Sequence, residues 1–552
     1  MTTEPLVAVD GLSVAFPAAP GAGDGPVRAV DGLSFALAPG AALGIVGESG
    51  SGKSTAAYAL LGLHRGTGAR VTGSVRVGGH DVLAADDAEL RRLRGPVAAM
   101  VFQDPLSSLD PYQAIGDQIA EVHRVHRRDV SRRAARARAV EVLDRVGIPD
   151  AARRARSRPH EFSGGMRQRA LIAMALACEP RLLVADEPTT ALDVTVQAQI
   201  LGLLRELREE TGMGLILVTH DLGVASGNVE ELLVMKDGRA VEHGPVHGIL
   251  DAPARTYTRD LLAAVPRVNM RRQSTRRAGS DDSVLLEATG LRREFGRGRR
   301  TVTAVDGVSL TVRAGESVGV VGESGSGKTT LGRMLVRLLE PTGGELHYRG
   351  RDIGALKDRE LRSFRSELQM VFQDPVSSLN PRRSIGESIA DPLRAAGKLG
   401  EAQILARVRE LLERVGLDPG AYHRYPHEFS GGQRQRVGIA RALAPEPKLI
   451  VCDEPVSALD VTTQAQVVRL LGELQRDLGL ALVFIAHDLA VVRQVSDRLV
   501  VMRGGKIVEE GPADTVYEQP RHAYTQGLLA AVPVLGTPRR PAVGTAHRTP
   551  AA

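Results

Sequence analysis

The chain has 552 residues, of which 43% are hydrophobic and 25% charged, and its formal net charge is +6. This length predicts two or more domains, and the composition is typical of a soluble globular protein. No apolar run approaches the roughly 18–20 residues that cross a bilayer, and we expect no signal peptide at the start. The small charge and the aromatic content of 3% argue against a nucleic-acid surface, so we expect no nucleic-acid partner.

The first chemical motif in chain order is a glycine-rich loop. It follows an apolar run, 41–46, precedes a helix-like segment, 55–63, and matches the G-x-x-x-x-G-K-[ST] pattern in its required context. Glycines let consecutive N–H groups point at phosphate oxygens, and the next helix adds its positive dipole end. The lysine adds a full charge, and the serine hydroxyl can ligate Mg²⁺. We therefore expect a nucleotide at Gly47, Glu48, Ser49, Gly50, Ser51, Gly52, Lys53, Ser54 and Thr55.

Internal repetition is the dominant signal in the chain. The glycine-rich loop recurs after a second apolar run, 317–321, as Gly322, Glu323, Ser324, Gly325, Ser326, Gly327, Lys328, Thr329 and Thr330. Further motifs recur in the same order: Val-Phe-Gln-Asp-Pro from 101 and 371, His-Glu-Phe-Ser-Gly-Gly from 160 and 427, Asp-Glu-Pro from 186 and 453, His-Asp-Leu from 220 and 487, and Tyr-Thr from 257 and 524. This period is far too long for a solenoid, so we interpret the halves as one domain duplicated.

The repeat also gives the expected domain boundaries. We predict a first nucleotide-binding domain at 1–266 and a second at 284–533. Between them, 267–283 is polar and rich in arginine, which is typical of a linker. The last segment, 534–552, has no periodicity and several prolines, so we expect a disordered tail.

Short apolar runs alternate with amphipathic stretches within each half. In the first half, 182–185, 215–218 and 232–235 indicate buried strands, and 196–209 indicates a helix. This alternation predicts an α/β fold, with two tandem P-loop NTPase domains that each have a mainly parallel sheet. The arginine-rich segment 115–146 is helical by pattern and would form a helical subdomain. It contains His123 and His126, but without other nearby ligands a metal site there is disfavoured.

Two acids end an apolar strand in each half. Asp186 and Glu187 follow the first-half strand, and Asp453 and Glu454 follow its twin at 449–452. The end of a strand beside a phosphate loop is where a Mg²⁺ partner belongs. We expect the aspartates to hold the metal through water and the glutamates to polarise an attacking water. The alternative, acids in structural salt bridges, is weakened by the matching phosphate loop.

A glutamine and a histidine complete each half. Gln103 and Gln373 follow apolar strands and begin proline-containing loops, where a side chain can bond Mg²⁺ and water and the loop can move. His220 and His487 end strands, and a neutral imidazole there could bond a γ-phosphate and hold the attacking water. In isolation each would be an ordinary turn or structural residue, so both interpretations depend on the neighbouring motifs.

A second anion-binding motif opens a helix in each half. It consists of Ser163, Gly164 and Gly165 in the first half, and of Ser430, Gly431 and Gly432 in the second. A serine with two glycines at a helix N-terminus is suited to an anion. One domain needs only one phosphate cradle, so two anion sites per half suggest that the halves share their sites.

Taken in order, these motifs resemble the nucleotide-binding domain of ATP-binding cassette (ABC) ATPases, in both halves. The Ala-Leu-Asp triplets that end at Asp193 and Asp460 complete the set. The resemblance covers nearly the whole chain, and the serine-glycine-glycine signature is specific to that family among P-loop proteins. It implies that ATP and Mg²⁺ are the cofactors, that Asp193 and Asp460 contribute to the ATP sites, and that Phe16 and Phe295 stack on adenine. It places at the metal Ser54, Gln103, Asp186, Thr329, Gln373 and Asp453.

A narrower resemblance is to the oligopeptide/dipeptide and nickel importer branch of this family. It rests on Phe-Gln-Asp-Pro-x-Ser-Ser-Leu from 102, on Asp-Glu-Pro-Thr-Thr-Ala-Leu-Asp-Val-Thr-Val-Gln-Ala-Gln from 186, and on Tyr-Thr-x-x-Leu-Leu-Ala-Ala-Val-Pro at the end of each half. In that branch the two ATPase subunits are usually separate chains, so this chain looks like their fusion. Some members carry a cysteine cluster after the Tyr-Thr motif. No cysteine follows Cys452 here, so we expect no iron–sulfur cluster.

The resemblance implies that the halves pair head-to-tail and enclose two ATP molecules. Lys53 and Glu187 would face the serine-glycine-glycine motif of the second half, and Lys328 and Glu454 would face that of the first. Both sites keep every motif, so we expect Glu187, His220, Glu454 and His487 to be catalytic and both sites to hydrolyse ATP.

The implied partners are two transmembrane permease subunits, which are separate chains docked near the Gln103 and Gln373 loops. An extracytoplasmic substrate-binding protein would deliver the substrate, a peptide or related small solute. The chain would then be peripheral, at the cytoplasmic side of the membrane. Two other functions stay open: a soluble tandem ABC ATPase that acts on ribosomes or nucleic acid, which usually has a longer basic linker, and a non-catalytic ATP-binding scaffold, which the intact Asp-Glu pairs disfavour.

Overall fold

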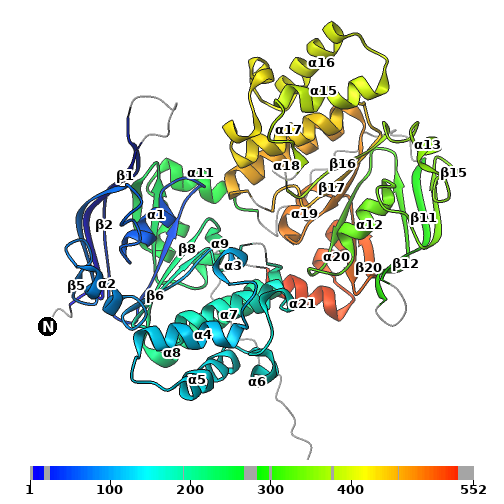
Figure 1. Ribbon diagram of the computed structural model, residues 1–552. Helices are drawn as coiled ribbons and strands as arrows, with labels where there is room; N and C mark the ends of the chain where they lie inside the picture. The colour runs from blue at the N-terminus through cyan, green and yellow to red at the C-terminus, as the bar shows by residue number, and fades with distance from the viewer. Residues whose placement is uncertain are drawn as a thin grey trace, which may run out of the picture.

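The computed structural model describes residues 4–17, 25–190, 192–266, 283–296, 301–374, 378–457 and 459–532. Two halves, the described residues of 4–266 and those of 283–532, repeat one architecture (Figure 1). The predicted tail lies outside the described residues, as does all of the predicted linker except Ser283. Within the described ranges, no helix is both long and apolar enough to cross a membrane.

At the centre of each half is a six-stranded sheet. Its order is β10-β9-β3-β8-β7-β6 in the first half and β20-β19-β13-β18-β17-β16 in the second. The edge strands β10 and β20 pair antiparallel, and the other neighbours pair parallel. The first-half strands are β3 (Ala42–Val46), β6 (Ala98–Val101), β7 (Leu182–Asp186), β8 (Gly214–Thr219), β9 (Glu231–Lys236) and β10 (Arg239–Pro245). Their counterparts are β13 (Ser317–Val321), β16 (Leu368–Val371), β17 (Leu449–Asp453), β18 (Ala481–Ile485), β19 (Arg498–Arg503) and β20 (Lys506–Pro512).

The predicted α/β fold is confirmed in both halves. β3, β7 and β8 are buried along their whole length, which explains their unbroken apolar runs. A second, four-stranded antiparallel sheet lies at the outer side of each half (Figure 1). It contains β1 (Val7–Phe16), β2 (Val27–Leu37), β4 (Arg70–Val77) and β5 (His80–Asp81), and in the second half β11 (Val284–Phe295), β12 (Val302–Arg313), β14 (Gly343–Tyr348) and β15 (Arg351–Asp352).

Helices cover the sheets and carry the site motifs. The first-half helices are α1 (Lys53–Ala59), α2 (Asp87–Leu93), α3 (Pro105–Ser108), α4 (Ile115–His126), α5 (Arg132–Arg145), α6 (Ala151–Arg154), α7 (Gly164–Leu176), α8 (Val194–Thr211), α9 (Leu222–Ser226), α10 (Val246–Asp251) and α11 (Thr256–Ala264). Those of the second half include α12 (Lys328–Leu335), α13 (Asp358–Leu361), α15 (Ile385–Ala396), α16 (Glu401–Arg414), α17 (Gly431–Leu443), α18 (Val461–Leu478), α19 (Leu489–Val495), α20 (Ala513–Glu518) and α21 (Ala523–Ala531).

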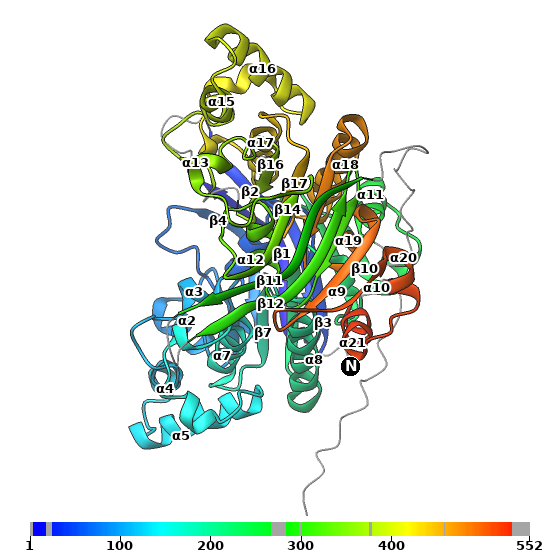
Figure 2. The same cartoon turned by 90° about the vertical axis from the view of Figure 1, so that its right-hand side faces the viewer.

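The halves run in opposite directions. The helical groups α4–α5 and α15–α16 lie at opposite ends of the molecule in both views (Figure 1, Figure 2). Contact between the halves comes in matched pairs, α11 of the first half against α18 of the second, and α21 against α8. This pairing is the head-to-tail arrangement that the sequence analysis expected.

The segment 115–146 is helical as predicted, and it consists of two helices, α4 and α5. α4 ends at His126, and Ser131 begins α5 by accepting a hydrogen bond on its side chain from the N–H of Ala134 at 3.2 Å. The serine satisfies an N–H that a helix start leaves free, so it favours a new helix at this point. His123 Nδ1 lies 3.0 Å from the carbonyl oxygen of Ala177, which follows α7.

We predict that Leu143→Ala in α5 lowers the free energy of unfolding by about 2–4 kcal/mol, because the fully buried side chain would leave a cavity in the helical subdomain. Urea denaturation followed by circular dichroism measures the change, since the chain contains no tryptophan to report by fluorescence. The control is Val125→Ala on α4, whose side chain is 57% exposed. An equal effect of the two substitutions would contradict the prediction.

Candidate nucleotide sites

Each glycine-rich loop turns between a parallel strand and a helix, in the form that the motif requires. At Gly47 the backbone has φ +154°, and a Cβ there would lie 2.2 Å from the carbonyl oxygen of Met235 on β9. Gly322 meets Met502 on β19 in the same way. A side chain therefore has no room at this position, and the close approach of loop and strand depends on glycine.

The lysine of each loop is buried inside its own turn. Lys53 donates hydrogen bonds from Nζ to the carbonyl oxygens of Gly47 at 2.9 Å and of Glu48 at 2.7 Å. Lys328 does the same to Gly322 and Glu323, both at 2.7 Å. Burial lowers the pKa of both lysines, against the raising effect of the neighbouring glutamates and aspartates. The ammonium charge is thus held where a phosphate would meet the loop.

The structure brings a hydroxyl and a carboxylate together beside each loop, as predicted for a metal site. Ser54 Oγ donates to Asp186 Oδ1 at 3.0 Å, and Thr329 Oγ1 donates to Asp453 Oδ1 at 2.8 Å. Asp186 Oδ2 is buried and has no hydrogen-bond partner among the described residues. Burial raises the pKa of Asp186 to about 6 and also raises that of Asp453. An unpartnered buried carboxylate oxygen beside a hydroxyl fits a hard cation such as Mg²⁺.

Glu187 and Glu454 follow their strands in a strained backbone conformation. Both have φ +45°, which is uncommon for a residue other than glycine and is concentrated at functional sites. Each N–H remains bonded to the neighbouring strand, Glu187 to the carbonyl oxygen of Val218 and Glu454 to that of Ile485, both at 2.9 Å. The strain therefore aims the carboxylate away from the sheet and toward the loop while the strand end stays paired.

The predicted glutamine, glutamate and histidine meet in the first half. Gln103 Nε2 donates to Glu187 Oε2 at 2.9 Å, and His220 Nδ1 lies 3.0 Å from Glu187 Oε1. A third partner was not predicted: Thr190 Oγ1 donates to Glu187 Oε2 at 2.8 Å. The Glu187 carboxylate is therefore the point at which the other three side chains meet.

The second half repeats this cluster with one fewer bond to the carboxylate. Gln373 Nε2 donates to Glu454 Oε2 at 2.9 Å, and His487 Nδ1 lies 3.4 Å from the same oxygen. Ser457 replaces the threonine, and its hydroxyl bonds the main-chain carbonyl of Glu454 instead, at 3.2 Å. The Thr190–Ser457 difference is visible in the sequence, but only the structure shows what it does to the glutamate.

We expected neutral imidazoles at His220 and His487, and each of them lies beside a glutamate that raises its pKa. Burial lowers the pKa of His220, but its hydrogen bond to Glu187 and the charge of that carboxylate outweigh the effect, so the pKa lies above its ordinary value. His487 responds to Glu454 in the same direction. The glutamates shift in the opposite direction: burial raises the pKa of Glu187, but the bond to His220 and the charge of that histidine lower it further.

Residues of the first half complete the second site. A pocket at the second phosphate loop is lined by Leu192 and Asp193 from the first half, together with second-half residues that include Lys328, Glu454 and His487. Asp193 Oδ2 accepts a hydrogen bond from the N–H of Ser324 at 3.4 Å. Thr195 Oγ1, a contact that was not predicted, donates to Glu323 Oε1 at 3.0 Å. At the first site, the charge of Asp460 from the second half raises the pKa of Lys53.

We expected each serine-glycine-glycine motif to face the glycine-rich loop of the opposite half. Within the described residues, Ser163 does not line the pocket at the second loop. Its Oγ caps α7, accepting from the N–H of Met166 at 3.3 Å, and Ser430 caps α17 in the same way through Gln433. Gly165 packs on α8 of its own half, because a Cβ there would be 2.5 Å from Val196. In this structure each serine therefore serves to begin its own helix.

Phe16 and Phe295 end the matching strands β1 and β11 but stand in unlike surroundings. The Phe16 ring meets the His64 ring edge-on, with 5.6 Å between centroids. Phe295 is 42% exposed, and the Arg293 guanidinium lies 4.8 Å from the centre of its ring. Neither contact tests the stacking on adenine, which stays a prediction.

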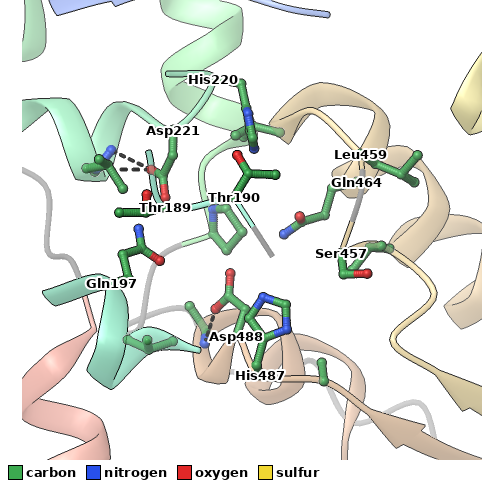
Figure 3. Close-up of a pocket in the computed structure, with 18 of the residues that line it drawn as sticks. Thr189, Thr190, Gln197, His220, Asp221, Ser457, Leu459, Gln464, His487 and Asp488 are labelled. Atoms are coloured by element: carbon green, nitrogen blue, oxygen red, sulfur yellow. Dashed lines mark hydrogen bonds between the residues drawn. The ribbon is translucent and has the colours of Figure 1, made fainter. Parts of the chain in front are cut away.

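A cavity of about 120 Å³ lies between the halves, where the residues that follow β8 and β18 approach each other. Figure 3 shows His220 and Asp221 on one side and His487 and Asp488 on the other, with Thr189, Thr190 and Ser457 around them. Each aspartate caps the next helix, Asp221 by accepting from the N–H of Gly223 at 2.7 Å and Asp488 from that of Ala490 at 2.8 Å. The two sites are therefore separated by one small shared cavity.

Known proteins match the chain over most of its length. A family model described as ABC transporter matches residues 30–190 and 305–457, and one described as the C-terminal region of oligopeptide/dipeptide transporters matches 241–290 and 508–552. The glutathione import ATP-binding protein GsiA of Escherichia coli O157:H7 is 46% identical over 563 residues, covering 96% of this chain and 90% of that protein. GsiA of Salmonella choleraesuis is also 46% identical, over 568 residues.

Solved structures match one half at a time. The dimeric ATP-binding cassette MJ0796, in a post-hydrolysis state bound to ADP and Pi, is 31% identical with a TM-score of 0.39, covering 42% of this chain and 99% of that one. The cbiO1 protein of Clostridium perfringens is 28% identical with a TM-score of 0.40, covering 43% and 92%.

The fold and the paired sites define a tandem ATPase of the ABC transporter family, and the chain belongs to that family. Within it, the chain is a fused member of the oligopeptide/dipeptide branch, an ATP-hydrolysing subunit of an importer with two nucleotide-binding domains. This assignment replaces the ribosome-directed ATPase and the non-catalytic scaffold that the sequence left open.

We predict that Asp186→Asn stabilises the nucleotide-free protein by about 1–3 kcal/mol at pH 7 and weakens binding of ATP with Mg²⁺. The ionised carboxylate is held in a buried position that raises its pKa to about 6, and a neutral amide of the same shape removes that cost. Differential scanning fluorimetry without nucleotide measures the first effect. Asp144→Asn, at an exposed position of α5, is the control, and a lower melting temperature for Asp186→Asn would refute the explanation.

Proposed function

We propose that the chain binds and hydrolyses one ATP at each glycine-rich loop and that these events drive two separate permease subunits that import peptides or related small solutes. The observation that supports this most is the duplicated cluster of glutamine, glutamate and histidine beside a lysine loop. Both halves contain the lysine, glutamine, glutamate and histidine, so neither half has the features of a degenerate site.

The phosphates would lie along Gly47–Thr55 and Gly322–Thr330, against the buried lysines. The donors suited to Mg²⁺ are Ser54 and Asp186 in the first half and Thr329 and Asp453 in the second. Gln103 and Gln373 donate through Nε2 to the glutamates, which leaves each Oε1 to face the metal. When bound there, Mg²⁺ would neutralise charge on the phosphate oxygens.

Glu187 and Glu454 are assigned as the groups that polarise the attacking water. Each carboxylate is placed by its glutamine and histidine neighbours, which suits it to orient a water and take its proton. His220 or His487 would hydrogen-bond the γ-phosphate. Further closure would bring Ser430–Gly432 to the first site and Ser163–Gly165 to the second, with Asp193 and Asp460 already at the boundary.

The permease subunits would dock on the loops that follow Gln103 and Gln373. The first of these loops exposes an apolar surface, with Phe102 at 38%, Leu106 at 64% and Tyr112 at 84% exposure. Exposed large apolar side chains gathered on one loop are typical of an interaction site. Docking there would hold the chain peripherally at the cytoplasmic side of the membrane, with an extracytoplasmic binding protein supplying a substrate of the peptide class. Glutathione, which the relatives' names give, is one such peptide.

We predict that Glu187→Gln and Glu454→Gln each lower steady-state ATPase activity to about half or less, and that the double variant loses roughly 10²–10⁴-fold. A glutamine keeps the shape but cannot take the proton. Glu209→Gln, at an exposed position of α8, controls for charge. If either single variant keeps the full wild-type rate, the two sites do not both hydrolyse ATP.

Purification from detergent-solubilised membranes tests the partners. Mass spectrometry is expected to find two membrane-spanning subunits with the chain and to identify any bound solute. Recovery of the chain with ribosomes and not with membranes would overturn the importer assignment.

A further inference from the structure

The Tyr-Thr motif near the end of each half has no part in the proposed function, yet its tyrosine lies against the glycine-rich loop. The Tyr257 hydroxyl accepts a hydrogen bond from the N–H of Glu48 at 3.3 Å, across 209 residues of sequence. The Tyr524 hydroxyl accepts one from the N–H of Glu323 at 2.9 Å, across 201 residues. The same long-range contact in both halves makes it a feature of the fold and not of a local turn.

The ring of each tyrosine is held at the strand on which the loop rests. Lys236 Nζ lies 4.8 Å from the centre of the Tyr257 ring, and Arg503 Cζ lies 4.9 Å from that of Tyr524. Lys236 and Arg503 are the last residues of β9 and β19. Each directly follows the methionine whose carbonyl oxygen lies close to the first glycine of the loop. A cation over an aromatic face is attractive, so ring, strand end and loop form one packed unit.

The hydroxyl supplies a partner that the loop would otherwise lack. A buried backbone N–H without an acceptor costs free energy, and the second residue of the loop offers its N–H to the tyrosine. This occupies the N–H of Glu48 and of Glu323 and anchors each loop at its second residue. Burial raises the pKa of Tyr257 to about 12, so the hydroxyl stays neutral at physiological pH.

The helix that carries each tyrosine also contacts the opposite half. Leu261 and Val265 at the end of α11 belong to one apolar cluster with Val461, the first residue of α18. In the mirrored contact, Leu528 and Val532 cluster with Val194, the first residue of α8. α8 and α18 begin directly after Asp193 and Asp460. Each helix that carries a tyrosine, α11 or α21, therefore lies between the glycine-rich loop of its own half and the aspartate of the other half.

We propose that Tyr257 and Tyr524 are positioning residues for ATP: each hydroxyl fixes the second residue of the glycine-rich loop, and its helix joins that loop to the start of α18 or α8 in the opposite half. This proposal rests on the proposed function, because it assumes that ATP binds at these loops. Fixing the loop before ATP arrives lowers the ordering cost of binding, so the hydroxyl acts on affinity more than on the chemical step.

The test replaces each tyrosine with phenylalanine, which removes only the hydroxyl. Tyr257→Phe is made in the Glu454→Gln background and Tyr524→Phe in the Glu187→Gln background, so that one site reports the activity. We expect the KM for ATP to rise about two- to tenfold, the effect of one hydrogen bond, with kcat within about twofold of its parent. Hydrogen exchange without nucleotide should become faster in the loop peptide of the altered half alone.

The matched control is Tyr348→Phe, which removes a buried hydroxyl bonded to Glu367 away from both loops. It should lower the melting temperature without changing KM or the exchange of either loop. Unchanged KM and exchange in both tyrosine variants would overturn the proposal, as would a loss of kcat and melting temperature with KM unchanged. If the wild-type chain itself does not bind ATP, the proposed function fails instead.

Discussion

A buried lysine held by the carbonyl oxygens of its own loop is the interaction on which both sites depend. Lys53 and Lys328 are each 5% exposed, and the aspartates and glutamates at the strand ends are arranged around their charge. Removing that charge would leave several buried carboxylates without compensation. The rest of each half keeps this charge in place. Glycines let the loop pack closely against a neighbouring strand, the sheet places the acids at its strand ends, and a tyrosine hydroxyl accepts a hydrogen bond from the loop.

The head-to-tail pairing extends this dependence across the whole chain. Asp193 and Thr195 bond residues of the second loop, and Val461 packs into the apolar core of the first half. The surroundings of the second loop therefore include residues of both halves.

Much of the fold and site could be predicted because the determining signals are local. A buried parallel strand is an unbroken apolar run, and the loop that binds phosphate is one stretch of nine residues, so Lys53, Asp186 and Glu187 could be assigned from spacing alone. The tyrosine contact could not, because residues 209 positions apart give no periodic signal. The same limit applies to the raised pKa of His220, which depends on a carboxylate placed by another strand.

The joining of two unlike halves in one polypeptide has a consequence for assembly. Thr190 and Ser457 show that the halves are related but not interchangeable, and the contacts of α11 and α21 pair each half with the other. Two separate ATPase subunits would have to find each other at cellular concentrations and could also form mixed or identical pairs. A covalent connection raises the effective concentration of the correct mate to the millimolar range that short linkers give. The ratio of one first half to one second half is thus fixed when the chain is synthesised.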